Sequence, residues 1–226
     1  MKRVGGVALG AVVAGVALVF LSPLAFREID FFRVRQIEVV GLQYLDHRAV
    51  LESLELAPDR TVFHSPKEIV ERGMAIPGVE GVEVERRLPG TLRITFQERA
   101  PVAFEISDSG LIPLDEWGQA LPYDPLVSGM DLPLVARADP ALIRALAVVR
   151  STDLALFQEA ESASIRADST VAIQLADQVL LLHGVPSIER LEDIAAVRRR
   201  LDEEPRPASE IDARFDGWII VRGGLS

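Results

Sequence analysis

Residues 82–98, VEVERRLPGTLRITFQE, decide the fold of this chain because two alternating segments flank a turn signal. Leucine, proline and glycine at positions 88–90 form that signal, since proline and glycine favour tight turns. A period of two places alternate side chains on one face of a strand. The segment therefore predicts a β-hairpin with one buried face. Its apolar positions are Val82, Val84, Leu92, Ile94 and Phe96.

The residues before this hairpin predict a strand and two helices. Residues 34–40 alternate and are rich in β-branched side chains, which indicates a strand ending at Gly41. Asp46 can cap a short helix. Residues 65–68, SPKE, match a capping box with proline at the first helical position, and Pro77-Gly78 ends that second helix. The predicted order up to residue 98 is strand, helix, helix, strand, strand.

The residues after 99 predict a second α+β region. Prolines make the stretch 121–133 irregular. Ser187 is expected to cap a helix whose apolar stripe contains Ile188, Leu191, Ile194 and Leu201. Asp216-Gly217 is the strongest short-range hairpin turn in the chain. The expected elements are strands at 102–106 and 111–114, a helix from Asp139-Pro140 to about 150, strands at 170–175 and 178–183, the helix after Ser187, and strands at 209–215 and 218–222.

The composition argues against several classes of protein. An apolar content of 49% excludes a disordered chain. The net charge of −10, with no basic run longer than residues 198–200, argues against non-specific nucleic-acid binding, which needs clustered Lys and Arg. The absence of cysteine excludes disulfides, thiolate catalysis and cysteine-based zinc sites.

Residues 4–26 form a predominantly apolar segment. At about 1.5 Å per residue it reaches roughly 34 Å, enough to cross a hydrocarbon core of about 30 Å. A cleaved secretory signal is the alternative, but its apolar core is about 7–15 residues long, and residues 22–26 offer a poor cleavage site. We therefore predict an uncleaved transmembrane helix. Arginine and lysine lie on both sides of it, so charge alone leaves its direction open.

The last predicted strand is a candidate docking site. Residues 218–221, WIIV, are hydrophobic and lie close to the chain end, with Phe215 just before the turn. If this strand lies at a sheet edge, its free N–H and C=O groups can pair with an incoming strand, and the aromatic residues can anchor it. The alternative is that all four residues face the core. The predicted partner-binding residues are Phe215, Trp218, Ile219, Ile220 and Val221.

No pattern in the sequence predicts a catalytic, cofactor or metal site. His47, His64 and His183 fall in separate elements without the spacing of a metal motif. Glu83 and Glu85 share a strand face, but alternation with valines makes them an exposed polar face rather than a catalytic pair. No nucleophile or phosphate-binding motif occurs, so we expect no enzyme activity and no cofactor.

Four segments together resemble the FtsQ/DivIB family of bacterial cell-division proteins. They are IEVVG at 37–41, IPGV at 76–79, VERRLPGTLRI at 84–94 and ERAPVA at 98–103. Weaker matches are Asp115 with Gly118, LPL at 132–134 and DARF at 212–215. Two features depart from the family pattern: Gly78 replaces the usual aromatic residue, and only residues 1–3 precede the apolar segment.

The resemblance implies an architecture and a function. It implies a cytoplasmic tail at 1–3, a transmembrane helix at 4–26, a POTRA domain of β-α-α-β-β order at 33–100, and an FtsQ-type β domain at 101–222 with a mostly antiparallel sheet, before a tail at 223–226. The bulk would lie outside the cytoplasmic membrane, at the division septum. The family members are divisome scaffolds that bind FtsB-like and FtsL-like proteins, contact other divisome components through the POTRA domain, and help control septal peptidoglycan synthesis.

Two other functions stay open from the residues. A POTRA-type chaperone module of outer-membrane assembly would carry further POTRA units or a barrel, which we do not find in this sequence. A membrane-anchored cell-wall hydrolase would need an acid pair or metal ligands that converge in a cleft. The scaffold is the hypothesis that the residues favour.

Overall fold

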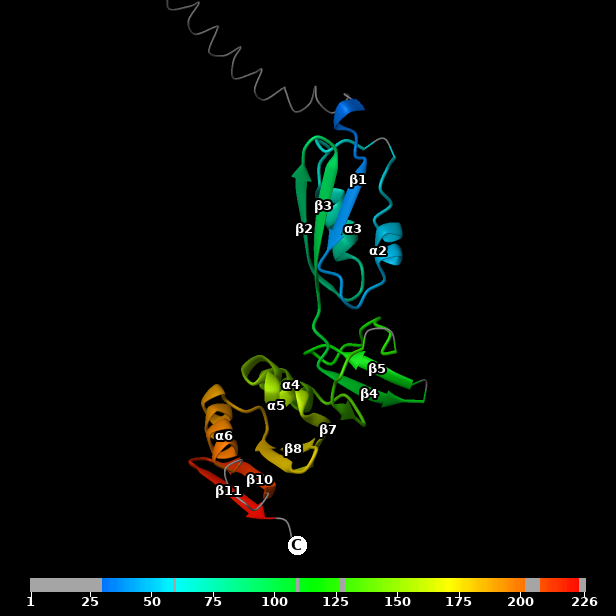
Figure 1. The fold of residues 1–226 in the computed structure, drawn as a ribbon. Coiled ribbons are helices and arrows are strands. Elements are labelled where there is room, and N and C mark those ends of the chain that lie inside the picture. Colours follow the sequence, from blue (N-terminus) through cyan, green and yellow to red (C-terminus); the bar gives the residue numbers. More distant parts are fainter. Residues whose placement is uncertain (1–29, 59, 109, 127–128, 202–207, 224–226) are drawn as a thin grey trace, which may run out of the picture. The chain divides into compact units, whose positions relative to one another are not determined.

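A computed structural model describes residues 30–58, 60–108, 110–126, 129–201 and 208–223. The predicted transmembrane helix and the residues 1–3 and 224–226 lie outside this range. Within the described residues, no helix is long and apolar enough to span a membrane. The chain divides into two compact units, one up to Glu98 and one from Arg99 (Figure 1).

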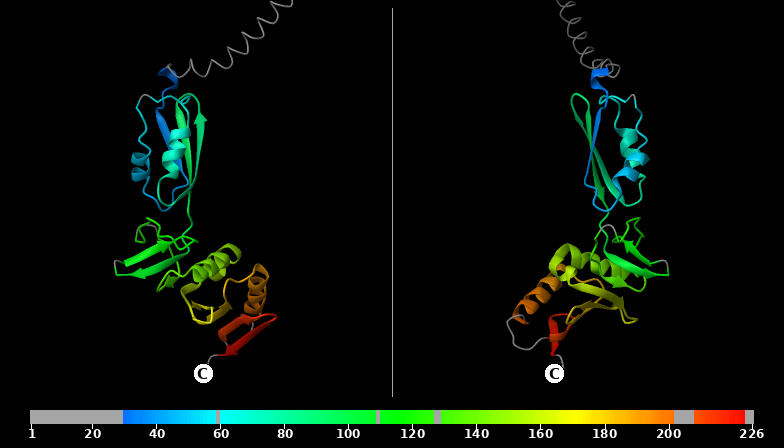
Figure 2. Two further views of the ribbon diagram at one scale, coloured as in Figure 1. Left: turned by 180° about the vertical axis from the view of Figure 1, so that it is seen from behind. Right: turned by 45° about the vertical axis from the view of Figure 1, so that its right-hand side comes forward.

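Unit 1 has the β-α-α-β-β order that the sequence predicts. After a short 3-10 helix η2 (Asp30–Phe32), its elements are β1 (Gln36–Val40), α2 (His47–Ser53), α3 (Lys67–Met74), β2 (Val79–Arg87) and β3 (Thr91–Glu98). The sheet order is β1-β3-β2, with β1 parallel and β2 antiparallel to β3. Both helices lie on one face of this sheet (Figure 2). The hairpin at 82–98 is thus confirmed as its central feature.

The core of unit 1 joins the helices to the hairpin. Ile94 and Phe96 of β3 are buried with Leu54 and Ile69 from the helical segments. Gly41 ends β1 at a φ of +86°, where a Cβ atom would lie 2.1 Å from the carbonyl oxygen of Phe96. Only glycine fits this position without moving the central strand. Glu83 and Glu85 are exposed, as predicted for the outer face of β2.

The predicted capping box of α3 is wrong in detail. The Ser65 hydroxyl accepts from the N–H of Lys67 at 3.3 Å, and Pro66 occupies the N-cap position without a side-chain cap. The Glu68 carboxylate pairs with Arg60 Nη1 at 3.4 Å instead of returning to Ser65. Because the Glu68 carboxylate pairs with Arg60, it does not complete the capping box. The cap of α2 is confirmed, because Asp46 Oδ1 accepts from the N–H of Ala49 at 2.8 Å.

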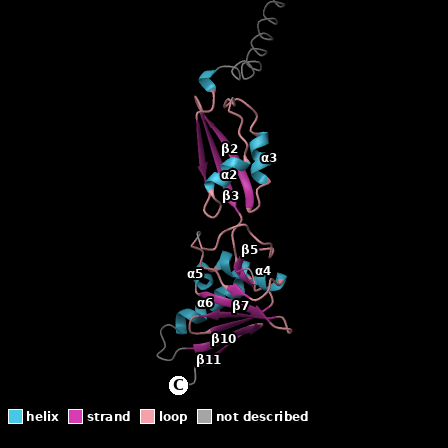
Figure 3. Cartoon of the chain, turned by 90° about the vertical axis from the view of Figure 1, so that its right-hand side faces the viewer, coloured by secondary structure: helices cyan, strands magenta, loops and turns pink. Residues whose placement is uncertain are grey.

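Unit 2 contains one sheet whose described strands have the order β11-β10-β9-β8-β7-β6-β4-β5. Its helices are α4 (Pro140–Thr152), α5 (Leu154–Gln158) and α6 (Ile188–Leu201) (Figure 3). Its strands are β4 (Ala103–Ser107), β5 (Gly110–Leu114), β6 (Leu134–Val135), β7 (Ala160–Ile165), β8 (Thr170–Leu175), β9 (Val179–His183), β10 (Ala208–Phe215) and β11 (Trp218–Gly223).

The sheet is mixed more evenly than predicted. The hairpin pairs β4–β5, β7–β8, β8–β9 and β10–β11 are antiparallel, whereas β4–β6, β6–β7 and β9–β10 are parallel. The sequence prediction also lacked α5, β6 and β7. Gly223 belongs to β11 and not to a tail.

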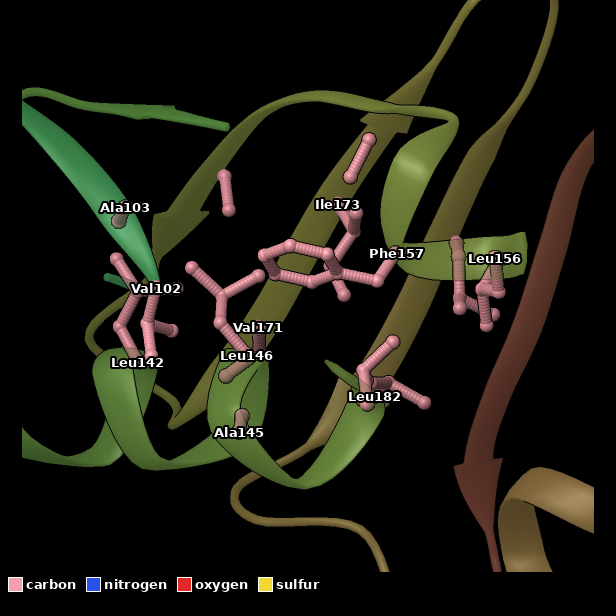
Figure 4. Packing of buried hydrophobic residues seen from close by; sticks show 14 of the residues in the cluster. Val102, Ala103, Leu142, Ala145, Leu146, Leu156, Phe157, Val171, Ile173 and Leu182 are labelled. Carbon is pink, nitrogen blue, oxygen red and sulfur yellow. The ribbon is translucent and has the colours of Figure 1, made fainter. Parts of the chain in front are cut away.

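The three helices pack against one face of the sheet through a large apolar core. Leu146 of α4 and Phe157 of α5 lie beside Ile173 of β8 (Figure 4). Leu191 and Ile194 of α6 are also buried there, but Ile188 is 57% exposed, so its predicted place on the apolar stripe is wrong. Ile188 is the first residue of α6 and lies at the end of the packed face.

The first two residues of the motif at 98–103 each make side-chain hydrogen bonds within their own unit. The Glu98 carboxylate accepts hydrogen bonds from the backbone N–H groups of Gln43, Tyr44 and Leu45 at 2.8–3.2 Å. Arg99 Nη1 donates to Oδ2 of the buried Asp115 at 3.1 Å. Glu98 therefore fixes the loop after β1 of unit 1, and Arg99 fixes the turn after β5 of unit 2.

Replacing Glu98 with glutamine should lower the free energy of unfolding of unit 1 by about 1 kcal/mol, because an amide accepts these hydrogen bonds more weakly than a carboxylate. Urea denaturation of residues 30–226, followed by circular dichroism, measures the change. Glu85→Gln is the matched control, since Glu85 lies on the exposed face of β2. Equal stabilities of the two variants would contradict the role of Glu98 in fixing the loop after β1.

Candidate partner-docking edge

The predicted docking strand lies at an edge of the large sheet. β11 is the terminal strand of the described sheet and pairs only with β10. The opposite edge, β5, is partly covered: Leu114 forms a bridge with Ala120, and the N–H of Leu121 donates to the Pro113 carbonyl. An edge strand presents backbone N–H and C=O groups that can pair with another strand. Among the residues that the structure describes, β11 is therefore the more open of the two edges.

Four of the five predicted partner-binding residues are exposed. Trp218 is 75% exposed, Phe215 49%, Ile220 40% and Val221 39%. Ile219 instead packs partly buried against the core of unit 2. The strand therefore does not bury all its apolar residues, and only Ile219 behaves as the core-facing alternative expects. The two most exposed of these side chains, Trp218 and Phe215, are aromatic, and aromatic residues are common anchors of protein interfaces.

Arg190 of α6 holds the end of this hairpin, a role that the sequence did not suggest. Its Nε donates to the Ala213 carbonyl at 3.0 Å, and its Nη2 donates to the carbonyls of Phe215 and Trp218. The β10–β11 register shifts between Asp212 and Phe215, so a bulge interrupts the ladder here. Arg190 thus supplies hydrogen bonds where the irregular ladder ends, and it fixes the backbone beneath Trp218.

A buried carboxylate supports the same hairpin from the sheet face opposite the helices. Asp212 is 0% exposed and receives two hydrogen bonds from the Arg214 guanidinium, at 2.8 and 2.7 Å. These bonds hold the pKa of Asp212 below its ordinary value; burial opposes the shift, and the Arg214 N–H adds to it.

The same arginine connects the carboxylate to an exposed ring. The Arg214 guanidinium lies 5.6 Å from the centroid of Phe215, within the range of a cation–π contact. Hydrogen bonds to Asp212 raise the pKa of Arg214, so the guanidinium stays charged. Asp212, Arg214 and Phe215 form a chain of contacts from the buried face to the exposed end of the hairpin.

Arg222, the charged residue near the end of β11, pairs within its own hairpin. It pairs with Glu210 across from it on β10, and its Nη2 lies 3.7 Å from Asp212 Oδ2. Its charge is therefore directed toward β10 and away from the open side of β11. The sequence could not show this, because the β10–β11 register places these three residues together.

Two carboxyls near this edge have lowered pKa values. A hollow beside the hairpin turn is lined by His183, Glu189 and Asp216, among others. The pKa of Glu189 is lowered by its own backbone N–H and by the Ser187 hydroxyl, and the pKa of Asp168 is lowered by hydrogen bonds from Thr170. These carboxyls stay ionised at neutral pH, whereas a glycosidase acid needs a raised pKa.

Known proteins resemble this chain over both units. Residues 32–99 match the family described as POTRA domain, FtsQ-type. A protein of Myxococcus fulvus is 29% identical over 210 residues, which are 84% of this chain and 74% of that protein. A protein of Rhodothermus marinus is 27% identical over 235 residues, 95% of this chain and 86% of that protein. Both are named "Cell division protein FtsQ". Both comparisons support the resemblance of this chain to the FtsQ/DivIB family.

A third relative, with lower identity to this chain, carries the same name. A protein of Mycobacterium tuberculosis with the same name is 23% identical over 189 residues, 81% of this chain and 58% of that protein. The resemblance inferred from the hairpin and junction motifs is thereby confirmed, and unit 1 is a POTRA domain. These relatives support a role for this chain in bacterial cell division.

Proposed function

We propose that this chain is a member of the FtsQ/DivIB family and a non-enzymatic scaffold of the divisome. It binds FtsB-like and FtsL-like partners outside the cytoplasmic membrane and helps control septal peptidoglycan synthesis. Residues 4–26 anchor it as a single transmembrane helix, with the N-terminus in the cytoplasm and both units outside. The POTRA domain contacts other divisome components. Its relatives, named as cell-division proteins, support this role.

The observation that carries the proposal is the open edge of β11 with exposed Trp218 and Phe215 beside it. A segment of the FtsB-like partner adds to this edge as a further strand, so main-chain hydrogen bonds provide affinity and the aromatic side chains provide anchors. Arg190 and Asp212 hold the hairpin in shape before binding, which lowers the entropy cost of association. The anchor confines the search for partners to the plane of the membrane.

The fluorescence of Trp218 can test this docking directly, because the chain has only two tryptophans. In a Trp117→Phe variant of the full chain, Trp218 is the sole tryptophan. We expect its emission to shift to shorter wavelength and saturate as the extracytoplasmic segment of the FtsB-like protein is added, because the indole leaves water.

The Trp218→Phe variant is the matched control, since it retains only Trp117 and should show no shift. Binding of the partner without any change at Trp218 would contradict docking at β11, and so would intact capture after deletion of residues 215–222 from a folded protein. Release of soluble products from purified peptidoglycan would contradict the non-enzymatic part of the proposal.

A further inference from the structure

Two of the most exposed apolar side chains of the POTRA domain lie at one end of it. Phe31 is 60% exposed in η2, and Leu88 is 63% exposed in the β2–β3 turn. The N–H of Arg35 donates to the Gly90 carbonyl at 2.8 Å, and a Cβ atom on Gly90 would lie 2.6 Å from the Arg33 carbonyl oxygen. The segment at 31–35 and the turn at 88–90 are therefore parts of one surface (Figure 1).

The Phe31 ring is held in its exposed position. It meets Phe32 edge to face, with ring centroids 5.1 Å apart, and Phe32 meets Phe63 in the same way at 5.0 Å. Arg35 lies 5.8 Å from the Phe31 centroid and donates to its carbonyl oxygen at 2.6 Å. Phe32 itself packs against the core. The exposed ring is thus fixed by the fold.

In the sequence around these two side chains, at 27–35 and 84–92, arginines outnumber acidic residues, although Glu28 and Asp30 precede Phe31. Arg35, which lies against the Phe31 ring, and Arg86, two residues before Leu88, are exposed, and we name these two arginines with Phe31 and Leu88 the basal patch. Arg87 is different, because it pairs with Glu38 and Glu85. Neither Arg35 nor Arg86 has a carboxylate partner among the described residues. This local excess contrasts with the net charge of −10 for the chain.

The length of the intervening chain restricts what the basal patch can meet. The proposed anchor ends at Phe26, and the five residues from there to Phe31 span at most about 18 Å. The headgroup layer covers roughly 5–8 Å of that distance. Even a fully extended connection keeps Phe31 within about 13 Å of the lipid headgroups, which is less than two Debye lengths at physiological salt, where that length is about 8 Å.

We propose that the basal patch docks on the anionic surface of the membrane. Phe31 and Leu88 enter the interface between headgroups and acyl chains, and the arginines contact lipid phosphates. The proposal rests on the anchor at residues 4–26. Its consequence is a fixed orientation of the POTRA domain. The β2–β3 ladder runs from Arg87–Thr91 at the membrane to Val79–Glu98, about 27 Å farther out.

The absence of cysteine makes a site-specific test simple. A Leu88→Cys variant of the full chain, labelled with an environment-sensitive fluorophore, is reconstituted into phosphatidylcholine vesicles containing about 30% phosphatidylglycerol. We expect lipids with spin labels near the headgroup to quench Leu88→Cys at least threefold more than Met74→Cys. Met74 is a matched control, since it is 46% exposed at the end of α3, toward the far end of the domain. Omitting phosphatidylglycerol should at least halve the quenching at position 88.

A third labelled variant separates the proposal from the anchor on which it rests. Ala14→Cys, in the middle of the proposed anchor, should be quenched by lipids with deep spin labels. Quenching at position 14 with none above the Met74→Cys level at position 88 would overturn membrane docking and leave the anchor intact. Lack of quenching at position 14 would overturn both. Quenching at position 88 that is unaffected by anionic lipid would overturn the role of the arginines.

Discussion

Replacing Trp218 with alanine should weaken capture of the FtsB-like partner by at least tenfold while leaving the fold intact. Trp218 is 75% exposed, so its removal takes little from the core of unit 2. An indole that becomes buried on binding covers about 200 Å², and truncation of such an anchor typically costs about 2 kcal/mol or more. A loss of about 2 kcal/mol corresponds to roughly a 30-fold weaker dissociation constant.

The measurement is isothermal titration of the full chain with the partner segment, together with a thermal melt of each variant. Trp117→Ala is the matched control, because Trp117 is 51% exposed in the same unit and follows the opposite edge strand, β5. Equal affinity of the Trp218→Ala variant and the unmodified chain would show that the partner binds elsewhere. A loss of affinity caused equally by Trp117→Ala would show that the effect is not specific to β11.

Local sequence patterns predicted most of this fold because its hairpins carry their own turn signals. The hairpin at 82–98 was recognisable from alternation around a turn, and the hairpin at 209–222 from its Asp216-Gly217 turn; the two strands at 170–183 were predicted as well. β7 escaped prediction because its buried positions are the small residues Ala160 and Ala163, interleaved with serines, which give little hydrophobic contrast. β6 has only two residues, and its parallel pairs join segments far apart in the sequence.

The candidate site shows the same division between local and long-range information. The hydrophobic last strand and its aromatic residues could be read from residues 215–221. That Ile219 faces the core while Ile220 does not depends on the sheet register. The support from Arg190 depends on the position of α6 beside the bulge. Arg190 lies 23 residues before Ala213, to which it donates a hydrogen bond. No local pattern marks an arginine whose partners are backbone carbonyls.

Replacing Asp212 with asparagine should lower the free energy of unfolding by about 2 kcal/mol at pH 7, since charge-assisted hydrogen bonds to a buried carboxylate are worth roughly 1.5–3 kcal/mol. The asparagine has the same shape but no charge to match Arg214. It should also weaken partner capture, because Arg214 would be less firmly held over Phe215. Asp168→Asn is the control: that carboxylate is 61% exposed and 3.8 Å from Arg214, so its removal should change stability little.

The pH dependence of this difference identifies the charge as its cause. Because folding lowers the pKa of Asp212, the carboxylate contributes its full stabilisation above the unfolded-state pKa of about 3.9 and loses it as the pH falls through the lower folded-state value. The stability gap between the unmodified chain and Asp212→Asn should therefore be constant from about pH 5 to 8 and shrink below about pH 4. Other carboxylates titrate alike in both proteins and cancel in the difference. Denaturant titrations at several pH values measure it, and a gap that stays constant down to pH 2.5 would mean that asparagine disrupts packing and not an ionic contact.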